Sequence, residues 1–247
     1  MKALILAGGR GKRLTEFSNS QNKCMLSVGG RTLIEYGLDC AMSAHVDEII
    51  IVVGYKAEDI INAYGIDYKG KRVKYVMQHD QRGLVHAVEC SHEAIGGDDL
   101  MLLLGDEILI NPKHQAMIEK FKVEEPFGIC GVVWVEDTSQ ISKTYSIVQD
   151  GDQRIYRLIE KPRKPLSNWM GTGNCVFRNE ILAYIPQTPI NQQRGEKELP
   201  DLIQCAIDEG HIVKSFVICD HYANINSEDD LREAGRYLSL VQEECTI

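Results

Sequence analysis

Three short apolar runs, residues 3–7, 48–53 and 100–104, constrain the fold of this chain more than any other feature of its sequence. They do not alternate with polar residues as strands with one solvent-facing side do, so we expect parallel strands buried on both faces. Helical patterns at 33–41, 57–64 and 84–94 fall between these runs, and a further strand is expected at 73–77. This alternation predicts a Rossmann-like three-layer α/β/α fold around a mixed, mostly parallel central sheet.

The second half of the chain has a different pattern. Strands are expected at 127–135, 173–177 and 213–218, and a hairpin at 147–159 that turns at Gln149-Asp150-Gly151-Asp152. Helices are expected at 112–122 and 199–209, and Ser227 should cap a terminal helix. No repeat or Gly/Ser linker divides the chain. We therefore expect one domain, residues 1–247, with a nucleotide-binding half at about 1–110 and a substrate-binding half at about 111–247.

Composition excludes several classes of partner. The formal net charge of −9 argues against non-specific nucleic-acid binding. The longest apolar runs are far shorter than a membrane span, so no membrane partner is expected. The N-terminus does not resemble a secretory signal, which favours a cytoplasmic protein.

The first apolar run ends in Gly8-Gly9-Arg10-Gly11, followed by Lys12 and Arg13. Glycines let a backbone approach a ligand closely, and free N–H groups beside two cations suit a polyphosphate. The alternative is an ordinary strand-to-helix turn with solvated basic residues. The loop is neither a Walker loop nor a dinucleotide loop, because Arg13 and Leu14 stand where those patterns need Ser/Thr and Gly.

Further candidates stand just after predicted strands, where open parallel sheets bind ligands. Asp106 is suited to Mg²⁺, although an aspartate here could also cap the next turn. Gln78 has both a donor and an acceptor and could read a base edge, unless it is simply solvated. Glu160 and Lys161 follow a later strand. His86 and the other histidines lack metal-ligand spacing, and we interpret them as structural or solvated.

Taken in order, these segments resemble the sugar-1-phosphate nucleotidyltransferases over nearly the whole chain. The segments that carry the resemblance are Leu6-Ala7-Gly8-Gly9-Arg10-Gly11-Lys12-Arg13-Leu14, Asn22-Lys23-Cys24-Met25-Leu26, Gln78 with Gly83-Leu84, Leu104-Gly105-Asp106, Tyr145-Ser146-Ile147-Val148, Glu160-Lys161-Pro162, Thr172-Gly173, Gly195-Glu196-Lys197-Glu198 and Asn224 to Leu231. Each piece is weak alone, and their shared order is what makes the resemblance specific.

The resemblance implies the fold of nucleotide-diphospho-sugar transferases and a reaction between a nucleoside triphosphate, expected to be a pyrimidine one, and a hexose-1-phosphate. It implies that the second half of the chain binds the sugar phosphate. The implied nucleotide-binding residues are Leu6, Ala7, Gly8, Gly9, Gly11, Lys12, Arg13, Gln78 and Gly83, and the sugar-phosphate residues are Tyr145, Glu160, Lys161 and Gly173. Arg13, Lys23, Asp106 and Lys161 would be catalytic, and Asp106 and Asn224 would hold Mg²⁺.

Departures from the family pattern leave alternatives open. Asn22 and Cys24 replace two prolines around Lys23, so that segment should be less rigid. Asn224 stands where many members of the family have a second metal-binding aspartate. Acetylglucosamine-1-phosphate uridylyltransferases resemble this chain in having asparagine there, and we expect weaker metal binding rather than none. A cytidylyltransferase acting on a non-sugar phosphate such as phosphocholine, or a weakly active regulatory homologue, are the alternatives. The sequence does not indicate the base, the sugar or the oligomeric state.

Overall fold

The computed structural model describes residues 1–11 and 21–244, with side chains up to residue 239. The strands are β1 (Lys2–Leu6), β2 (Ser27–Val28), β3 (Arg31–Thr32), β4 (Glu48–Val53), β5 (Asp67–Tyr68), β6 (Lys71–Met77), β7 (Leu100–Leu104), β8 (Glu107–Ile110), β9 (Gly128–Trp134), β10 (Tyr145–Gln149), β11 (Ile155–Glu160), β12 (Trp169–Phe177), β13 (Ile190–Asn191), β14 (Glu196–Lys197), β15 (Val213–Val217) and β16 (His221–Asn224). The α-helices are α2 (Leu33–Ser43), α3 (Ala57–Tyr64), α4 (Leu84–Cys90), α5 (His92–Ile95), α6 (His114–Glu124), α7 (Leu199–Asp208) and α8 (Glu228–Glu244), and the 3₁₀ helices are η1 (Lys23–Met25), η2 (Thr138–Lys143) and η3 (Asn179–Tyr184).

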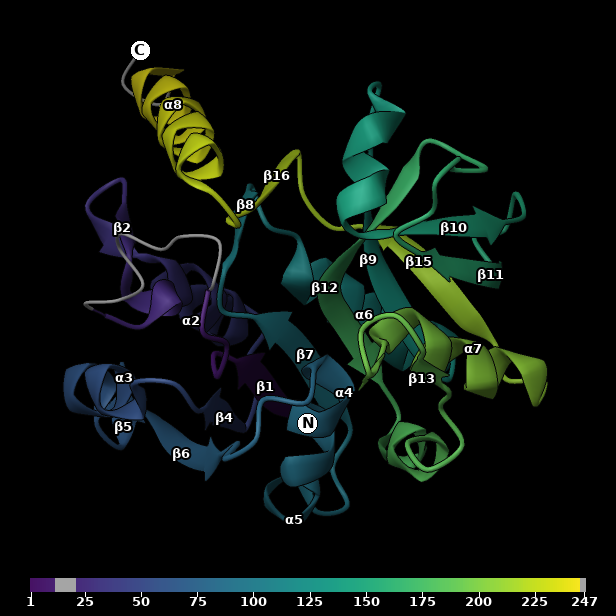
Figure 1. Ribbon diagram of the computed structural model, residues 1–247, viewed down its shortest axis with the longest axis horizontal. Helices are drawn as coiled ribbons and strands as arrows, with labels where there is room; N and C mark the ends of the chain where they lie inside the picture. The colour runs from purple at the N-terminus through teal and green to yellow at the C-terminus, as the bar shows by residue number, and fades with distance from the viewer. Residues whose placement is uncertain (12–20, 245–247) are drawn as a thin grey trace.

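A ten-stranded mixed sheet forms the centre of the fold, with the order β11-β10-β12-β7-β1-β4-β6-β5 and with β9 between β12 and β15 (Figure 1). Strands β6, β4, β1 and β7 run parallel, whereas β12 runs antiparallel to β7, β9 and β10. The first half of the chain therefore supplies the parallel part of the sheet, and the second half supplies most of the antiparallel part.

Helices cover both faces of this sheet because successive residues of the buried strands point to opposite sides. Ala3 and Ile5 of β1 pack into a core that includes side chains of α2, α3 and α6. Leu4 of the same strand packs into a second core with side chains of α4 and α7. The predicted three-layer arrangement and mixed sheet are confirmed.

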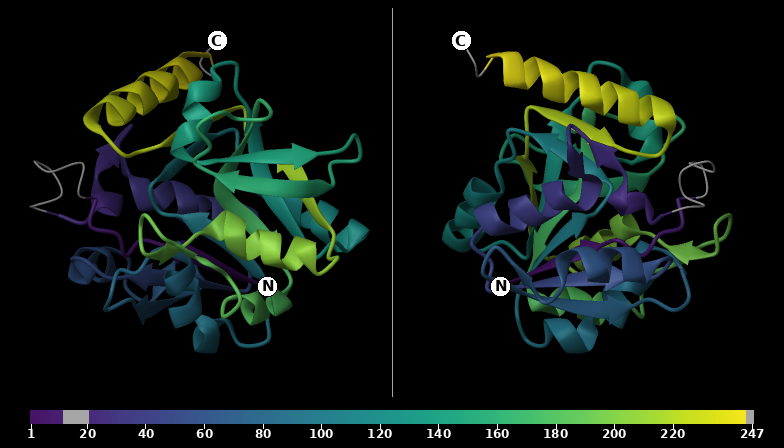
Figure 2. Two further views of the ribbon diagram at one scale, coloured as in Figure 1. Left: turned by 45° about the vertical axis from the view of Figure 1, so that its right-hand side comes forward. Right: turned by 90° about the vertical axis from the view of Figure 1, so that its left-hand side faces the viewer.

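A two-stranded antiparallel ribbon, β8 with β16, stands apart from the main sheet and was not predicted. Ile108 and Ile110 of β8 join Leu33 and Ala234 in a third core, on which helix α8 packs. Figure 2 shows α8 lying along the outside of this ribbon. The hydroxyl of Ser227 accepts a hydrogen bond from the N–H of Asp230 at 3.2 Å, so the predicted cap of α8 is confirmed.

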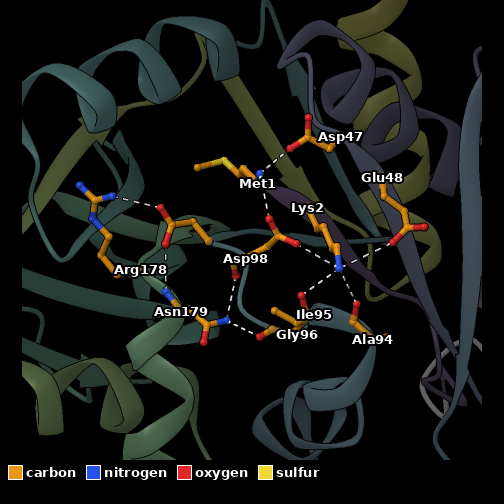
Figure 3. A network of polar contacts seen from close by, with 11 residues as sticks. Met1, Lys2, Asp47, Glu48, Ala94, Ile95, Gly96, Asp98, Arg178 and Asn179 are labelled. Carbon is orange, nitrogen blue, oxygen red and sulfur yellow. Dashed lines mark hydrogen bonds and ion pairs between the residues drawn. The ribbon is translucent and has the colours of Figure 1, made fainter.

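Charged residues gather at the end of the sheet where β1 and β4 begin (Figure 3). Nζ of Lys2 donates to the carbonyl oxygens of Ala94 and Ile95 at 3.0 and 2.9 Å. Those carbonyls lie at the C-terminal end of α5, where a cation is favourable. Glu48 is only 8% exposed, and the half-exposed Lys74 pairs with it at 2.8 Å, so the second apolar run begins with a buried carboxylate that has a cation beside it.

The helix predicted at 84–94 is divided into α4 and α5 at Ser91. The Ser91 hydroxyl donates to the carbonyl oxygen of Ala87 at 2.9 Å, and such a bond within a helix competes with the backbone ladder. The remaining predicted elements of the main sheet appear within a few residues of their expected bounds. In the described part of the chain, no helix has the length and apolar character needed to cross a membrane.

Candidate functional site

A cavity of about 610 Å³ opens at the ends of β1, β6 and β7. Its lining comprises Leu6, Ala7, Gly8, Gly9, Arg10, Gly11, Lys23, Cys24, Gln78, Gln81, Gly83, Leu84, Ala87, Leu104, Asp106 and Glu196. Most of these residues come from the carboxyl ends of parallel strands and from the start of α4, where ligands of open α/β sheets bind. Lys23 and Cys24 come from η1, and Glu196 comes from β14. The structure therefore brings together the predicted nucleotide-binding residues of the described chain with Lys23 and Asp106. Lys12 and Arg13 lie outside the described residues.

The glycine loop, Gly8 to Gly11, follows β1 and lines this cavity. The Gly8 carbonyl accepts a hydrogen bond from the N–H of Tyr55 at 3.2 Å, which ties the loop to the end of β4. Gly11 has a φ of +61°, and a side chain there would meet Lys23, so glycine is required on both grounds. Within residues 1–11 and 21–244, no backbone carbonyl accepts the N–H groups of Gly8 or Gly9. Those groups are available to an anion.

Asn22 anchors the segment that carries Lys23. Its buried side chain donates to the carbonyl oxygens of Ala7 and Tyr55 at 3.2 and 2.7 Å and accepts from the N–H of Cys24 at 2.8 Å. Its own N–H donates to Asp59 at 2.7 Å. Asn22 thus fixes the start of η1 through hydrogen bonds that a proline could not make, and the described part of this segment is well anchored despite the missing prolines.

Lys23 lies between the two halves of the site. Its side chain is 8% exposed, and its Nζ contacts Oδ2 of Asp106 at 2.5 Å. The same ammonium donates to Oδ1 of Asn226 at 3.3 Å. A buried cation is costly unless it is paired, so these oxygens hold the ammonium in place.

Asp106 and Asn224 are placed next to each other by the β8–β16 ribbon. The Asp106 carbonyl accepts from the N–H of Ile225 at 3.0 Å, and Asn224 stands opposite Glu107 in the ribbon. Oδ1 of Asn224 accepts from Nδ2 of Asn226 at 2.9 Å. No role was predicted for Asn226 from the sequence, although this residue lies in the segment from Asn224 to Leu231 that carries the family resemblance.

Glu107 is a second residue that the sequence reasoning missed. Its carboxylate accepts from the Tyr222 hydroxyl at 2.6 Å, from Nδ2 of Asn174 at 2.7 Å and from the N–H of Gly173 at 3.0 Å. Burial raises the pKa of Glu107 to about 8, and the neighbouring charge of Asp106 adds to the rise. Glu107 therefore ties β8, β12 and β16 together directly behind Asp106.

Gln78 and Gly83 form one wall of the cavity. Gln78 is 4% exposed and its Nε2 donates to the Gly83 carbonyl at 3.0 Å. Gly83 has a φ of +91°, and a side chain there would meet Glu196, which comes from β14. Glu196, from the second half of the chain, thus packs against the part of the cavity wall that Gln78 and Gly83 form.

The predicted sugar-phosphate residues lie outside the lining of the cavity. Tyr145 is buried, its ring packs against Gly171, and its hydroxyl donates to the carbonyl of Thr172 at 2.9 Å. Gly173 is covered by Leu104 and by Glu107. Their assignment to the sugar phosphate stays a prediction.

Glu160 and Lys161 belong to a charged cluster at the N-terminal end of α7. Glu160 contacts Nζ of Lys161 at 3.1 Å and the guanidinium of Arg194 at 3.2 Å. Arg194 also contacts Glu198 at 2.8 Å. Burial raises the pKa of Glu198 to about 6, and the nearby charge of Glu160 contributes. The cluster offers both an anion-binding group and hydroxyl-binding carboxylates.

A comparison with protein families matches residues 2–236 to the family described as Nucleotidyl transferase. The chain belongs to this family. A curated relative, UTP–glucose-1-phosphate uridylyltransferase AglF of Haloferax volcanii, is 31% identical over 248 residues, covering 100% of this chain and 98% of the relative. A glucose-1-phosphate thymidylyltransferase of Streptomyces griseus is 30% identical over 241 residues, covering 96% of this chain and 65% of the relative.

This family member also resembles solved structures in fold. An apo UDP-glucose pyrophosphorylase superimposes with a TM-score of 0.88 at 19% identity, with 98% of each chain covered. That likeness supports the fold alone. The chain spans 65% of the length of two of the curated relatives that it matches, and those proteins extend beyond the shared region.

Proposed function

We propose that the protein transfers a nucleotidyl group from a pyrimidine nucleoside triphosphate to a hexose-1-phosphate and releases pyrophosphate. The observation that carries this proposal is the convergence of the free glycine-loop N–H groups, Lys23 and Asp106 on one cavity. This combination suits a triphosphate and an oxygen-binding cation. The two curated relatives described above are named for glucose-1-phosphate, which supports a sugar phosphate as acceptor.

In this reaction a phosphate oxygen of the sugar phosphate attacks the α-phosphorus of the nucleotide. One P–O bond forms to that oxygen, and the bond from the α-phosphorus to the leaving pyrophosphate breaks. No general base is needed because the attacking oxygen is already ionised near neutral pH. Catalysis is then mainly positioning and neutralisation of charge.

Each group of residues has a part in this scheme. The N–H groups of Gly8, Gly9 and Gly11 bind the phosphates, and Arg13 accompanies the departing pyrophosphate. Lys23 neutralises charge at the α-phosphate. Gln78 and Gly83 bind the base. Glu160 binds sugar hydroxyls and Lys161 the sugar phosphate, with Tyr145 and Gly173 shaping the acceptor site.

Asp106 and Asn224 are the residues that would hold Mg²⁺. Within the described residues no group of three His, Cys, Asp or Glu side chains is arranged around a metal position. One carboxylate with one amide oxygen nevertheless fits Mg²⁺, which is commonly bound through one or two protein oxygens together with substrate phosphates. When bound, the ion would add positive charge beside the phosphates.

The test is pyrophosphate release from a panel of UTP, dTTP, CTP, ATP and GTP with glucose-1-phosphate, N-acetylglucosamine-1-phosphate and phosphocholine. We expect turnover with a pyrimidine triphosphate and a hexose-1-phosphate. Turnover with phosphocholine alone would contradict the proposed acceptor, and no turnover with any pair would contradict an enzymatic role. Asp106→Ala serves as the inactive control.

A further inference from the structure

The side chain amide of Gln78 has neighbours that fix its orientation. Nε2 of Gln78 lies 3.0 Å from the carbonyl oxygen of Gly83 and 3.0 Å from Nδ1 of His86. A carbonyl oxygen can only accept, so the NH₂ group of the amide must point to Gly83. Both hydrogens of that NH₂ group are then committed, one to Gly83 and one to His86.

This orientation also determines the protonation of His86. Because the NH₂ group of Gln78 donates to Nδ1, that nitrogen is an acceptor, and the neutral ring carries its hydrogen on Nε2. Cys90 Sγ lies 3.6 Å from Nε2 and can accept weakly. Arg82 lies 2.7 Å from the same Nε2 but can only donate. A hydrogen bond from Arg82 would require Nε2 to be the acceptor, whereas the hydrogen bond from Gln78 requires Nδ1 to be the acceptor.

The hydrogen bond from Gln78, rather than the one from Arg82, determines which nitrogen of His86 carries the hydrogen, because Gln78 is held in the cavity wall. Gln78 is 4% exposed, and its backbone N–H donates to the Val53 carbonyl at 2.8 Å. Arg82 is exposed on the turn before α4 and can move away at little cost.

The oxygen of the Gln78 amide, Oε1, has no hydrogen-bond partner among the described residues. Oε1 lies over Gly8, 3.0 Å from the point that a Cβ atom on Gly8 would occupy. Among residues 1–11 and 21–244, none donates a hydrogen bond to Oε1. Gln78 therefore offers the cavity an acceptor and no donor, and a base must bring the donor.

We propose that His86 is a positioning residue for base selection. Together with the Gly83 carbonyl it holds the NH₂ group of Gln78, so that the Gln78 oxygen faces the nucleotide and uracil or thymine is preferred over cytosine. Uracil and thymine carry a hydrogen on N3, whereas cytosine has a lone pair there that would face the Gln78 oxygen. The inference rests on the proposed function, since it concerns the base of the same triphosphate. It gives His86 a role that the interpretation of this residue as structural or solvated did not include.

Three variants test this role. His86→Asn keeps an acceptor near the position of Nδ1, His86→Leu removes it, and Arg82→Ala removes the competing donor. For each folded variant, calorimetry measures the affinity for UTP, dTTP and CTP, and kcat and KM are measured with glucose-1-phosphate. Thermal melting confirms that the variants are folded.

We expect the wild type to prefer UTP or dTTP over CTP by roughly 10- to 100-fold, which corresponds to the discrimination that one well-placed side chain gives between two bases. His86→Leu should lower this preference several-fold without abolishing it, because one of the two acceptors of the Gln78 NH₂ group is lost and the Gly83 carbonyl remains. The change should appear mainly in KM for the triphosphate, whereas kcat should change little. His86→Asn and Arg82→Ala should retain the preference. A merely structural role for His86 would lower stability without changing the ratio.

The possible failures are distinguishable. A wild type that binds and uses CTP as well as UTP would overturn the inference and leave the proposed function standing, as would a folded His86→Leu variant with unchanged preference. A loss of preference in Arg82→Ala would show that Arg82 sets the ring, and would also overturn it. If the wild type binds no triphosphate, both the inference and the proposed function fail. If His86→Leu does not fold, His86→Ala, which also removes the acceptor for Nε2 of Gln78, takes its place, and an unchanged preference in that variant overturns the inference.

Discussion

The side chains of Lys23 and Asp106 meet at 2.5 Å, although 83 residues separate them in the chain. Lys23 begins η1 and Asp106 follows β7, so this contact joins two segments that both line the cavity. Both groups are partly shielded, with side chains 8% and 24% exposed. Shielding strengthens their interaction with each other and with any phosphate that enters.

Replacing Lys23 by methionine should reduce kcat by roughly 100-fold or more, the usual effect of removing one group that stabilises developing charge. The measurement is steady-state pyrophosphate release with saturating substrates. Lys69→Met is the matched control, because Lys69 also pairs with a carboxylate, Asp39 at 2.6 Å, but lies on the exposed surface. Equal activity of the two variants would contradict a role for Lys23 in catalysis.

Asn224→Asp should strengthen metal binding, because it adds a second carboxylate beside Asp106. We expect the Mg²⁺ concentration for half-maximal activity to fall on the order of tenfold. Asn62→Asp adds the same charge on exposed helix α3 and should leave the requirement unchanged. The metal hypothesis for position 224 would be refuted by identical Mg²⁺ titrations of wild type and Asn224→Asp.

The buried strands and the helices between them could be predicted because local pattern determines them. Strands 48–53 and 100–104 and helix 57–64 agree with the structure residue for residue. The β8–β16 ribbon could not be predicted, because β16 is short and mostly half-buried and becomes a strand only by pairing with a segment about 110 residues away. The roles of Glu107 and Asn226 depend on that pairing, so they were missed together.

The candidate site was predictable where it follows the ends of parallel strands. Gly8, Gly83, Gln78 and Asp106 converge on the cavity as the sequence indicated. Lys161 follows a strand as predicted, whereas Glu160 is the last residue of β11 rather than the first residue after it. The distance of both residues from the cavity depends on how the antiparallel half folds. The hairpin of β10 and β11 was predicted from its turn, but its place in the sheet is set by the pairing of β10 with β12, which no local pattern encodes.

Gly171→Ala should destabilise the protein by about 3 kcal/mol or more, because a Cβ atom there would overlap with ring atoms of Tyr145. The ring is buried and its hydroxyl is bonded, so it cannot move aside cheaply. Chemical denaturation measures the free energy of unfolding. Gly151→Ala is the control, since a Cβ atom at Gly151 would meet nothing within 4 Å. Similar stability of both variants would mean that Tyr145 does not pack as described.

Protonation of His114 should lower the stability of the protein at acid pH. Burial lowers its pKa to about 4, from about 6.5 in the unfolded chain, and its Nε2 bonds Oδ1 of Asn174 at 2.8 Å. At His114 the unfolded state therefore binds more protons between pH 4 and 6.5. The contribution of His114 to the stability is full above pH 6.5 and is lost as the pH drops towards 4. The loss should be roughly 3 kcal/mol over that range.

The check is the free energy of unfolding of wild type and His114→Gln at several pH values from 4 to 7. The variant should lack this part of the pH dependence. His92→Gln removes an exposed histidine and should keep the wild-type slope. A slope unchanged by His114→Gln would show that another group titrates there.

The most direct test of the central claim is product formation by the wild-type protein with UTP or dTTP, glucose-1-phosphate and Mg²⁺. Phosphorus NMR identifies both products in one sample. We predict equal amounts of a nucleoside diphosphate sugar and pyrophosphate, and neither product with Asp106→Ala. Pyrophosphate or phosphate released without a nucleotide sugar, or substrates left unchanged by the wild type, would contradict the account.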